Sequence, residues 1–263
     1  MFVQKTLRRL AALVPAVLGA AALVTAPAHA EPALPPSGEV APLIVGGRPA
    51  TQQYPFTASL QQYGRHGCGA SLVAPRWLVT AAHCVTGGLQ ARIGSNDHTS
   101  GGELVQVAQS IRHPRYNGQA GPYDIAVMRL ASAVRSQPVT IAGSSPAPGT
   151  GVRLLGWGQE CPNPQCGPAP RNLKELDTRI NPDSMCRTGY DPSIELCVFG
   201  NATSGTACYG DSGGPLLVNG QLAGATSRAG ANSPTCGTGD ATVYTDVTAH
   251  RQWISQATGG AVR

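Results

Sequence analysis

The chain has 263 residues, of which 41% are hydrophobic and 13% are charged, with a formal net charge of +5. This composition suits a globular protein and excludes a disordered, highly charged chain. The basic residues are dispersed, so nothing in the charge pattern favours nucleic acid as a partner. After residue 43 the chain holds 16 basic and 12 acidic residues, a net charge of +4. This stretch is long enough for one domain or two closely packed halves.

Residues 1–30 predict a secretory signal peptide. Three basic residues precede an apolar run from Leu10 to Val24, and Ala28-His29-Ala30 then matches a small-residue cleavage pattern. The alternative is a membrane anchor, but the apolar run has only 15 residues and contains a proline and a glycine. A helix needs about 20 apolar residues to cross a bilayer. We therefore expect a secreted, extracellular protein with no membrane partner.

Residues 31–43 predict a propeptide. They contain four prolines and no periodic pattern, which is typical of an extended segment without a core of its own. The segment ends directly before Ile44-Val45-Gly46-Gly47, and a protein domain is expected from residue 44 to residue 263.

The rest of the chain consists mainly of short apolar or alternating runs broken by Gly, Pro, Asn or Ser. Such runs at this frequency are typical of an all-β sandwich or barrel. Examples of these strand-like runs are Phe56–Gln61, Ser71–Ala74, Leu104–Ile111, Ile125–Leu130, Val152–Gly156, Leu216–Val218 and Thr242–Val247. Two segments favour helix. Asn181-Pro182 begins a short turn that ends near Arg187, and Thr248 caps a terminal helix that ends near Thr258.

Three distant segments carry residues that suit nucleophilic catalysis. Ser212 stands in Gly210-Asp211-Ser212-Gly213-Gly214-Pro215, His83 follows an apolar run, and Asp124 begins another. A serine hydroxyl needs an adjacent base to take its proton. Flanking glycines let the backbone turn sharply, so that N–H groups stay free to hold an oxyanion. A carboxylate at the head of an apolar strand needs a partner, and a histidine supplies one.

Each of these residues also has a simpler explanation. Alone, His83 would be interpreted as a core histidine, Asp124 as a turn residue and Ser212 as a loop serine. The complete set favours catalysis. A lipase or esterase of the α/β-hydrolase type is disfavoured, because such enzymes carry the acid and the histidine after the serine, whereas both precede Ser212 here.

The order His83, Asp124, Ser212 resembles that of the chymotrypsin-like serine proteases. Ile44-Val45-Gly46-Gly47 and Gly156-Trp157-Gly158 strengthen the resemblance, which covers about residues 44–258. It implies an all-β fold of two packed six-stranded antiparallel β-barrels with a C-terminal helix. It also implies that His83 is the general base, that Asp124 orients it and that Ser212 is the nucleophile.

The resemblance further implies an oxyanion hole and activation by cleavage. The backbone N–H groups of Gly210 and Ser212 would hold the oxyanion. Cleavage after Leu43 would free the Ile44 ammonium, which would pair with the Asp211 carboxylate and order the oxyanion loop. The simpler explanation is that Asp211 caps a local turn. Only the ion pair with Ile44 makes activity depend on cleavage.

An Arg-rich, Ala/Gly/Pro-rich composition favours a bacterial host.

All eight cysteines lie beyond residue 43 and indicate an oxidising compartment. Their spacing alone does not assign pairs. The family resemblance implies Cys68–Cys84, Cys186–Cys197 and Cys208–Cys236, and the remaining Cys161 and Cys166 would pair with each other. No Cys-x-x-Cys suggests zinc, and the acids of Ser95–Glu103 are too few to predict a calcium site. We expect no metal and no cofactor.

The resemblance places a specificity pocket beside Ser212. Thr206 stands where trypsin-like members carry Asp, so a substrate Arg or Lys would lack an ion-pair partner at the base. The walls are expected to come from Ser227, Arg228, Ala229 and Thr242. Members with open pockets carry Gly at the positions of Ala229 and Thr242, so side chains here predict a narrowed, elastase-like pocket for small or medium apolar residues.

Arg228 stands where most relatives of this family have Trp. Two hypotheses remain open: its fork of donors binds substrate carboxylate or backbone oxygens, or it is a solvated loop arginine. Tyr209 is expected at the pocket rim or in simple packing.

The sequence thus predicts a secreted serine endopeptidase, made as a zymogen, that acts on protein or peptide substrates through an acyl-enzyme on Ser212. The alternative is a catalytically silent homologue that acts as a secreted binding module. We also expect a monomer that proteinaceous inhibitors can bind.

Overall fold

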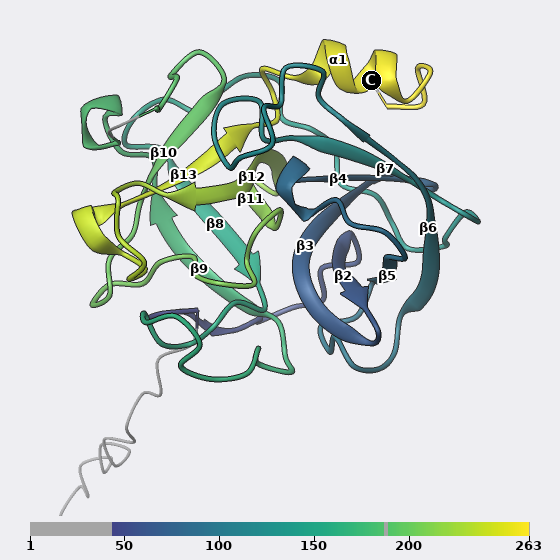
Figure 1. Cartoon of the computed structure of the whole chain (residues 1–263), viewed down its shortest axis with the longest axis horizontal. Helices are drawn as coiled ribbons and strands as arrows, with labels where there is room; N and C mark the ends of the chain where they lie inside the picture. The colour runs from purple at the N-terminus through teal and green to yellow at the C-terminus, as the bar shows by residue number, and fades with distance from the viewer. Residues whose placement is uncertain (1–43, 187–188, 263) are drawn as a thin grey trace, which may run out of the picture. The chain divides into compact units, whose positions relative to one another are not determined.

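The computed structural model describes residues 44–186 and 189–262. The predicted signal peptide and propeptide lie outside the described residues, as does Arg187, the expected end of the short turn. The described part consists of two antiparallel β-sheets, three short 3₁₀ turns and one α-helix (Figure 1).

The first sheet is a closed barrel of six strands in the order β2-β3-β4-β7-β6-β5. Successive side chains of a strand point to opposite faces, and the apolar set of each strand fills the barrel interior. Leu60, Leu72 and Met128 are each at most 1% exposed. The strands are β2 (Thr57–Gln62), β3 (Arg65–Ala74), β4 (Trp77–Thr80), β5 (Gln90–Ile93), β6 (Glu103–Arg112) and β7 (Ala126–Leu130).

The second sheet has seven strands in the order β1-β9-β8-β11-β12-β13-β10. An isolated antiparallel bridge between Ile180 and Val198 brings the β9 side of this sheet round to β10. Its own core contains Leu154, Leu216 and Tyr244. The strands are β1 (Arg48–Pro49), β8 (Gly151–Gly156), β9 (Lys174–Arg179), β10 (Glu195–Phe199), β11 (Pro215–Val218), β12 (Gln221–Ala229) and β13 (Ala241–Asp246).

The predicted fold class is confirmed, with one difference in strand count. The first barrel has the expected six strands, whereas the second sheet gains a seventh, β1. Arg48 of β1 pairs with Glu175 of β9, far away in the sequence. The two residues of β1 are exposed and carry no strand signal of their own. Only their long-range pairing with β9 makes them a strand.

The C-terminal helix α1 (Arg251–Ala257) packs on the first barrel (Figure 1). Thr248 does not cap it, contrary to the prediction. The Asp246 carboxylate accepts hydrogen bonds from the N–H groups of Thr248 at 2.8 Å and Ala249 at 3.3 Å, so a turn replaces the expected first helical residues. The helix begins after His250. No helix among the described residues has the length and apolar character needed to cross a membrane.

The other predicted turn is a 3₁₀ turn, η2 (Asp183–Met185), with no side-chain cap. The remaining 3₁₀ turns are η1 (Ala82–Cys84) and η3 (Thr238–Asp240).

Candidate active site

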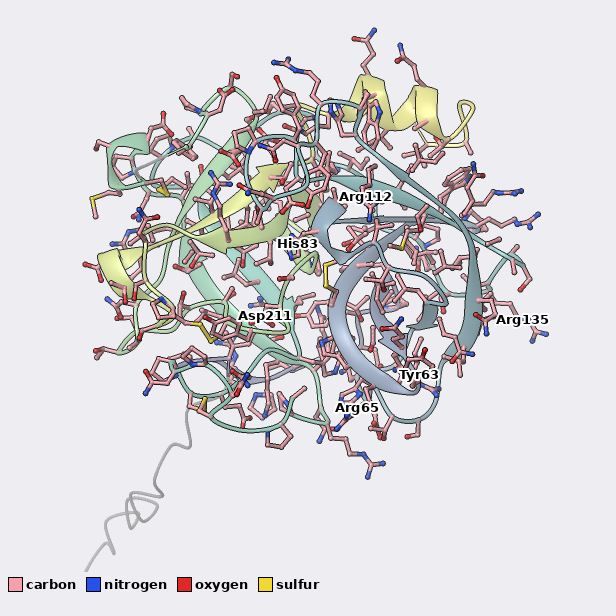
Figure 2. All side chains as sticks on the ribbon, viewed as in Figure 1. Tyr63, Arg65, His83, Arg112, Arg135 and Asp211 are labelled. Carbon is pink, nitrogen blue, oxygen red and sulfur yellow. A yellow bond between two sulfur atoms is a disulfide. The ribbon has the colours of Figure 1, made fainter. Side chains whose placement is uncertain are left out.

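The first barrel brings His83 and Asp124 to one end. Strand β4 pairs antiparallel with β7, with Thr80 opposite Ala126, so the segment after β4 meets the segment before β7. His83 lies on η1, directly after β4, and Asp124 lies two residues before β7. The Cys68–Cys84 disulfide ties η1 to β3. In Figure 2, His83 lies where the two sheets face each other.

The Asp124 carboxylate is the centre of a hydrogen-bond array. It is fully buried and accepts three bonds: from the His83 N–H at 2.9 Å, from His83 Nδ1 at 2.7 Å and from Ser227 Oγ at 2.7 Å. Because the carboxylate accepts from Nδ1, His83 carries its proton on that nitrogen and leaves Nε2 free as a base. The backbone carbonyl of Asp124 accepts from Thr245 Oγ1 at 2.9 Å, which fixes the main chain as well.

Ser212 comes from the loop before β11 and reaches the first barrel through close backbone contacts. The Gly69 N–H donates to the Ser212 carbonyl at 2.7 Å. Gly213 has φ 73°, and a Cβ there would meet Thr80 Oγ1 at 2.1 Å and the Ala81 nitrogen at 3.0 Å, so only glycine fits. Ser212 therefore lies beside the segment that carries His83. No hydrogen bond joins the Ser212 hydroxyl to another described residue; catalytic bonds are often long in an unliganded site.

The backbone of Gly210 adopts φ 99°, which favours glycine. Among the described residues, no acceptor takes the N–H groups of Gly210 or Ser212. The Tyr209 carbonyl accepts from the Gln159 N–H at 2.8 Å, and this bond orients the peptide unit that carries the Gly210 N–H. Two N–H groups without protein partners are what an oxyanion site requires.

His66 is a residue of this site that the sequence analysis missed. Its Nε2–H donates to the Gly210 carbonyl at 3.0 Å, and its Nδ1 lies 2.8 Å from Ser59 Oγ. Burial lowers its pKa to about 4, so the ring is neutral at neutral pH. A side chain of the first barrel thus holds the loop of the second sheet that carries Ser212. A histidine between Arg65 and Gly67 carries no sequence signal for such a contact.

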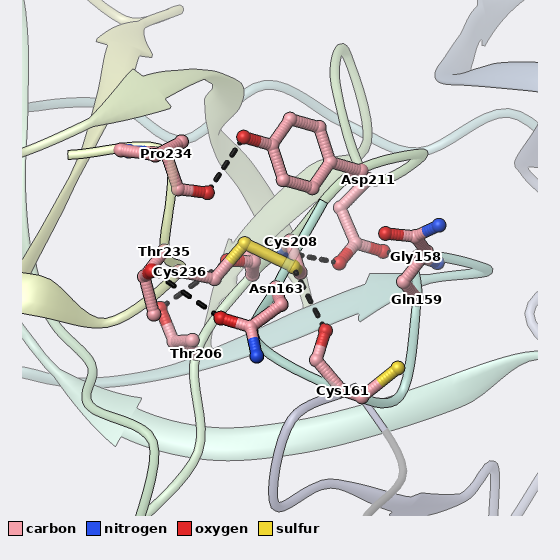
Figure 3. The surroundings of a disulfide bond; sticks show 12 residues. Gly158, Gln159, Cys161, Asn163, Thr206, Cys208, Asp211, Pro234, Thr235 and Cys236 are labelled. Atoms are coloured by element: carbon pink, nitrogen blue, oxygen red, sulfur yellow. Dashed lines mark hydrogen bonds between the residues drawn. A yellow bond between two sulfur atoms is a disulfide. The ribbon is translucent and has the colours of Figure 1, made fainter. Parts of the chain in front are cut away.

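Asp211 occupies a slot between two glycines. Its carboxylate is 2% exposed and accepts from the backbone N–H groups of Gly158 at 2.7 Å and Cys208 at 2.8 Å (Figure 3). A Cβ at Gly156 or Gly158 would lie 1.9 or 2.1 Å from its oxygens, which explains both glycines of Gly156-Trp157-Gly158. Burial raises the pKa of this carboxyl to about 6, against the two hydrogen bonds. No cation of the described residues pairs with it.

Ile44 is also buried, at 1% exposure, in the core of the second sheet. The next residue, Val45, accepts a hydrogen bond through its carbonyl from the Thr206 N–H at 2.8 Å. Ile44 has φ 38°, an unfavourable conformation for a β-branched residue.

A cavity of about 160 Å³ opens beside Ser212. The expected wall residues Ser227, Arg228, Ala229 and Thr242 all line it. Tyr209 lines it as well, and its hydroxyl donates to the Pro234 carbonyl at 2.6 Å. None of the described residues that line this cavity is a carboxylate.

Thr206 differs from its predicted place at the base of the pocket. It is fully buried behind the wall, and its Oγ1 lies 2.9 Å from Thr242 Oγ1. The two threonine hydroxyls are hydrogen-bonded to each other. Thr242 lines the cavity, and Thr206 supports Thr242 from behind.

Both hypotheses for the Arg228 side chain are wrong. Its two terminal nitrogens bind the Glu195 carboxylate, one of them at 3.0 Å, and Nη2 also donates to the Gly189 carbonyl at 2.9 Å. Glu195 is fully buried, so Arg228 neutralises a carboxylate of the protein itself. Its fork is therefore neither solvated nor free for substrate carboxylate.

Four disulfide bonds join the eight cysteines in the pairs expected from the sequence. Cys208–Cys236 borders the cavity and lies next to Asp211 (Figure 3). The acids of Ser95–Glu103 serve the fold: Asp97 accepts from Arg171, Thr99 and Ser100, and Glu103 from Ser136.

Comparison with known proteins identifies the family. The family model described as Trypsin matches residues 44–254. Trypsin alpha-4 of Lucilia cuprina is 36% identical over 231 residues, which cover 81% of this chain and 87% of that protein. Serine protease 1 of Canis lupus familiaris is 36% identical over 195 residues, which cover 70% and 78%. These animal relatives give no support to the bacterial host.

A solved structure agrees with the sequence matches. Neuropsin, a serine protease expressed in the limbic system of mouse brain, superposes with a TM-score of 0.73 at 32% identity, over 81% of this chain and 98% of that chain. The chain therefore belongs to the trypsin family of chymotrypsin-like serine proteases and is a serine endopeptidase.

Proposed function

We propose that this protein cleaves peptide bonds by the Ser-His-Asp mechanism, with Ser212 as nucleophile, His83 as general base and Asp124 as the group that orients His83. The observation that carries the proposal is the array in which Asp124 accepts from His83 Nδ1 and Ser227, while no described residue bonds His83 Nε2. His83 takes the Ser212 proton as Oγ attacks the carbonyl carbon, and returns it to the leaving amine. Water then hydrolyses the acyl-enzyme.

The free N–H groups of Gly210 and Ser212 stabilise the oxyanion of each tetrahedral intermediate in this proposal. The two bonds that fix the loop, from Gln159 to Tyr209 and from His66 to Gly210, keep these donors oriented before substrate arrives. Preorganised donors are effective because no reorganisation is required as charge develops.

Covalent labelling tests this assignment directly. A fluorophosphonate probe should form one adduct on Ser212 of the mature protein, and the adduct should be lost in Ser212→Ala. An unlabelled mature protein would instead favour a silent homologue that serves as a binding module.

We further propose that the protein is a secreted zymogen, with a signal peptide at residues 1–30, a propeptide at residues 31–43 and the protease domain at residues 44–263. The buried Asp211 carboxylate, which pairs with no cation of the described residues, supports activation by the freed Ile44 ammonium. N-terminal sequencing of the active secreted form should begin at Ile44. A fully active form that still carries residues 31–43 would contradict this proposal.

The cavity supports a preference for small or medium apolar residues before the scissile bond. None of the described residues that line it is a carboxylate, the Arg228 guanidinium is paired with Glu195, and the side chains of Ala229 and Thr242 occupy its walls. We therefore expect peptides with Ala, Val or Leu at this position to be cleaved faster than those with Arg, Lys or Trp. A profile of a mixed peptide library measures this, and a dominant preference for Arg or Lys would refute it.

Widening the pocket provides a second measurement. Thr242→Gly with Ala229→Gly should raise kcat/KM for Phe substrates relative to Ala substrates by about tenfold or more, since accommodated methylenes contribute about 1–3 kcal/mol each. Thr242→Ser is the matched control, because it keeps the hydroxyl that bonds Thr206. An unchanged Phe-to-Ala ratio in the double variant would show that other parts of the chain set the selectivity.

A further inference from the structure

A cluster of rings surrounds the residue that precedes Asp124. His113, Tyr123, His250 and Trp253 form this cluster, which we call the aromatic clamp. His113 stacks on Tyr123 with ring centroids 4.8 Å apart and 18° between the planes. The His113 ring also lies 5.2 Å from that of His250 and 4.9 Å from that of Trp253. The clamp thus joins the end of β6, the loop before β7 and the helix α1.

Tyr123 has an unfavourable backbone conformation. Its φ is 65°, in the left-handed region that residues with a side chain rarely adopt. The Ile125 N–H donates to the Tyr123 carbonyl at 2.8 Å, and the Asp124 N–H donates to the Gly121 carbonyl at 3.1 Å, so the chain turns tightly here. Such a conformation persists only where surrounding contacts hold it, and it is concentrated at functional sites.

The clamp supplies these contacts mainly with uncharged rings. His250 is 4% exposed, and its Nε2 has no hydrogen-bond partner among the described residues. Burial is the main cause that lowers the pKa of His250 to about 4, and repulsion between its protonated ring and a protonated His113 is the second. Burial, and after it the charge of Arg115, also lowers the pKa of His113. Both histidines are therefore neutral at neutral pH.

Arg115 adds a permanent positive charge that contacts the clamp. Its guanidinium carbon lies 4.0 Å from the Tyr123 ring centroid, within the range of a cation–π contact. The backbone N–H of Arg115 also donates to His113 Nδ1 at 3.2 Å, so the two residues that hold Tyr123 are linked to each other.

We propose that the aromatic clamp is a positioning device for the triad: by stacking on Tyr123 it holds the left-handed turn that aims the Asp124 carboxylate at His83. Asp124 is the next residue, so a change in the Tyr123 backbone rotates the chain that enters it. The inference rests on the proposed function, because it assigns the clamp an effect on the reaction and not on folding alone.

Three substitutions at Tyr123 separate the stack from the strained backbone. Tyr123→Phe keeps the ring and should retain kcat within about twofold. Tyr123→Ala removes the ring but keeps a Cβ at positive φ, and should lower kcat about 10- to 100-fold with KM nearly unchanged, the scale of a displacement near 1 Å. Tyr123→Gly also removes the ring but adopts this φ readily, and should recover at least about tenfold over Tyr123→Ala.

A second pair of variants tests the cation–π contact. Arg115→Gln removes the guanidinium from Tyr123, whereas the control Arg179→Gln removes the one that lies 4.0 Å from the Phe199 ring, outside the clamp. Only Arg115→Gln should lower kcat.

All kcat values are taken per active site titrated with a fluorophosphonate, so that loss of folded protein is not counted. Wild-type kcat in Tyr123→Ala, or a Tyr123→Gly enzyme no faster than Tyr123→Ala, would overturn the proposal. If the wild-type protein itself does not acylate Ser212, the proposed function fails; if it acylates and the variants turn over at its rate, only the role of the clamp fails.

Discussion

Ser212→Ala is expected to lower kcat by about 10⁴- to 10⁶-fold while the protein remains folded. The substitution removes the nucleophilic oxygen, and Ser212 lines the cavity and is not part of either core. The free energy of unfolding should therefore change by only about 0.5 kcal/mol. Stopped-flow hydrolysis of an activated ester by the mature enzyme, together with thermal unfolding, measures both quantities.

The matched test for this assignment is the double variant. His83→Ala alone should lower kcat about as much as Ser212→Ala, and Ser212→Ala with His83→Ala should lower it little further, because the two residues act as one unit. Additive losses in the double variant would show that His83 does not act through Ser212.

Asp211→Asn is expected to lower the activity of the cleaved enzyme about 100-fold or more. In the proposed activation, the Ile44 ammonium pairs with the Asp211 carboxylate, and an amide cannot form that ion pair. Asp211 lies between Gly210 and Ser212, whose N–H groups are the proposed oxyanion donors, so a misplaced loop loses both donors. Active-site titration and kcat of the mature variant measure the loss, and wild-type activity in Asp211→Asn would contradict the activation mechanism.

The same carboxylate predicts a pH dependence of stability in the uncleaved chain. Its pKa rises from an ordinary value near 4 to about 6 because it is buried, so between these values the folded state binds more protons than the unfolded state. The free energy of unfolding should therefore fall as pH rises from 4 to 6, by about 3 kcal/mol at most. Urea unfolding of uncleaved Ser212→Ala, which cannot process itself, measures this fall.

Two comparisons make this experiment specific. Adding Asp211→Asn to the uncleaved chain should remove the fall, because an amide does not titrate. Cleavage before Ile44 should remove it as well, because the ammonium favours the ionised carboxylate and lowers its pKa. A cleaved chain that still loses stability from pH 4 to 6 would show that Ile44 does not reach Asp211.

The sequence alone determined the features that depend on local pattern. Apolar runs between turn residues predicted seven strands that the structure contains, most within one residue at each end, because alternating burial follows from the two faces of a strand. β3 extends six residues further back than predicted, since Arg65, His66 and two glycines interrupt its apolar pattern. The segments around His83, Asp124 and Ser212 could be identified as candidate catalytic segments because sharp turns and buried acids require particular residue types.

Only the tertiary structure decided what depends on partners distant in the sequence. The sequence left open whether the Arg228 guanidinium binds substrate or is solvated, and the structure instead pairs it with Glu195, 33 residues away. Thr206 was predicted at the base of the pocket, but the structure places it behind Thr242, to which it is hydrogen-bonded. His66 reaches Gly210 across 144 residues, and His113 meets His250 through the packing of α1 on the first barrel. These contacts arise when the two sheets and the helix pack, and no local pattern encodes which side chains will then face each other.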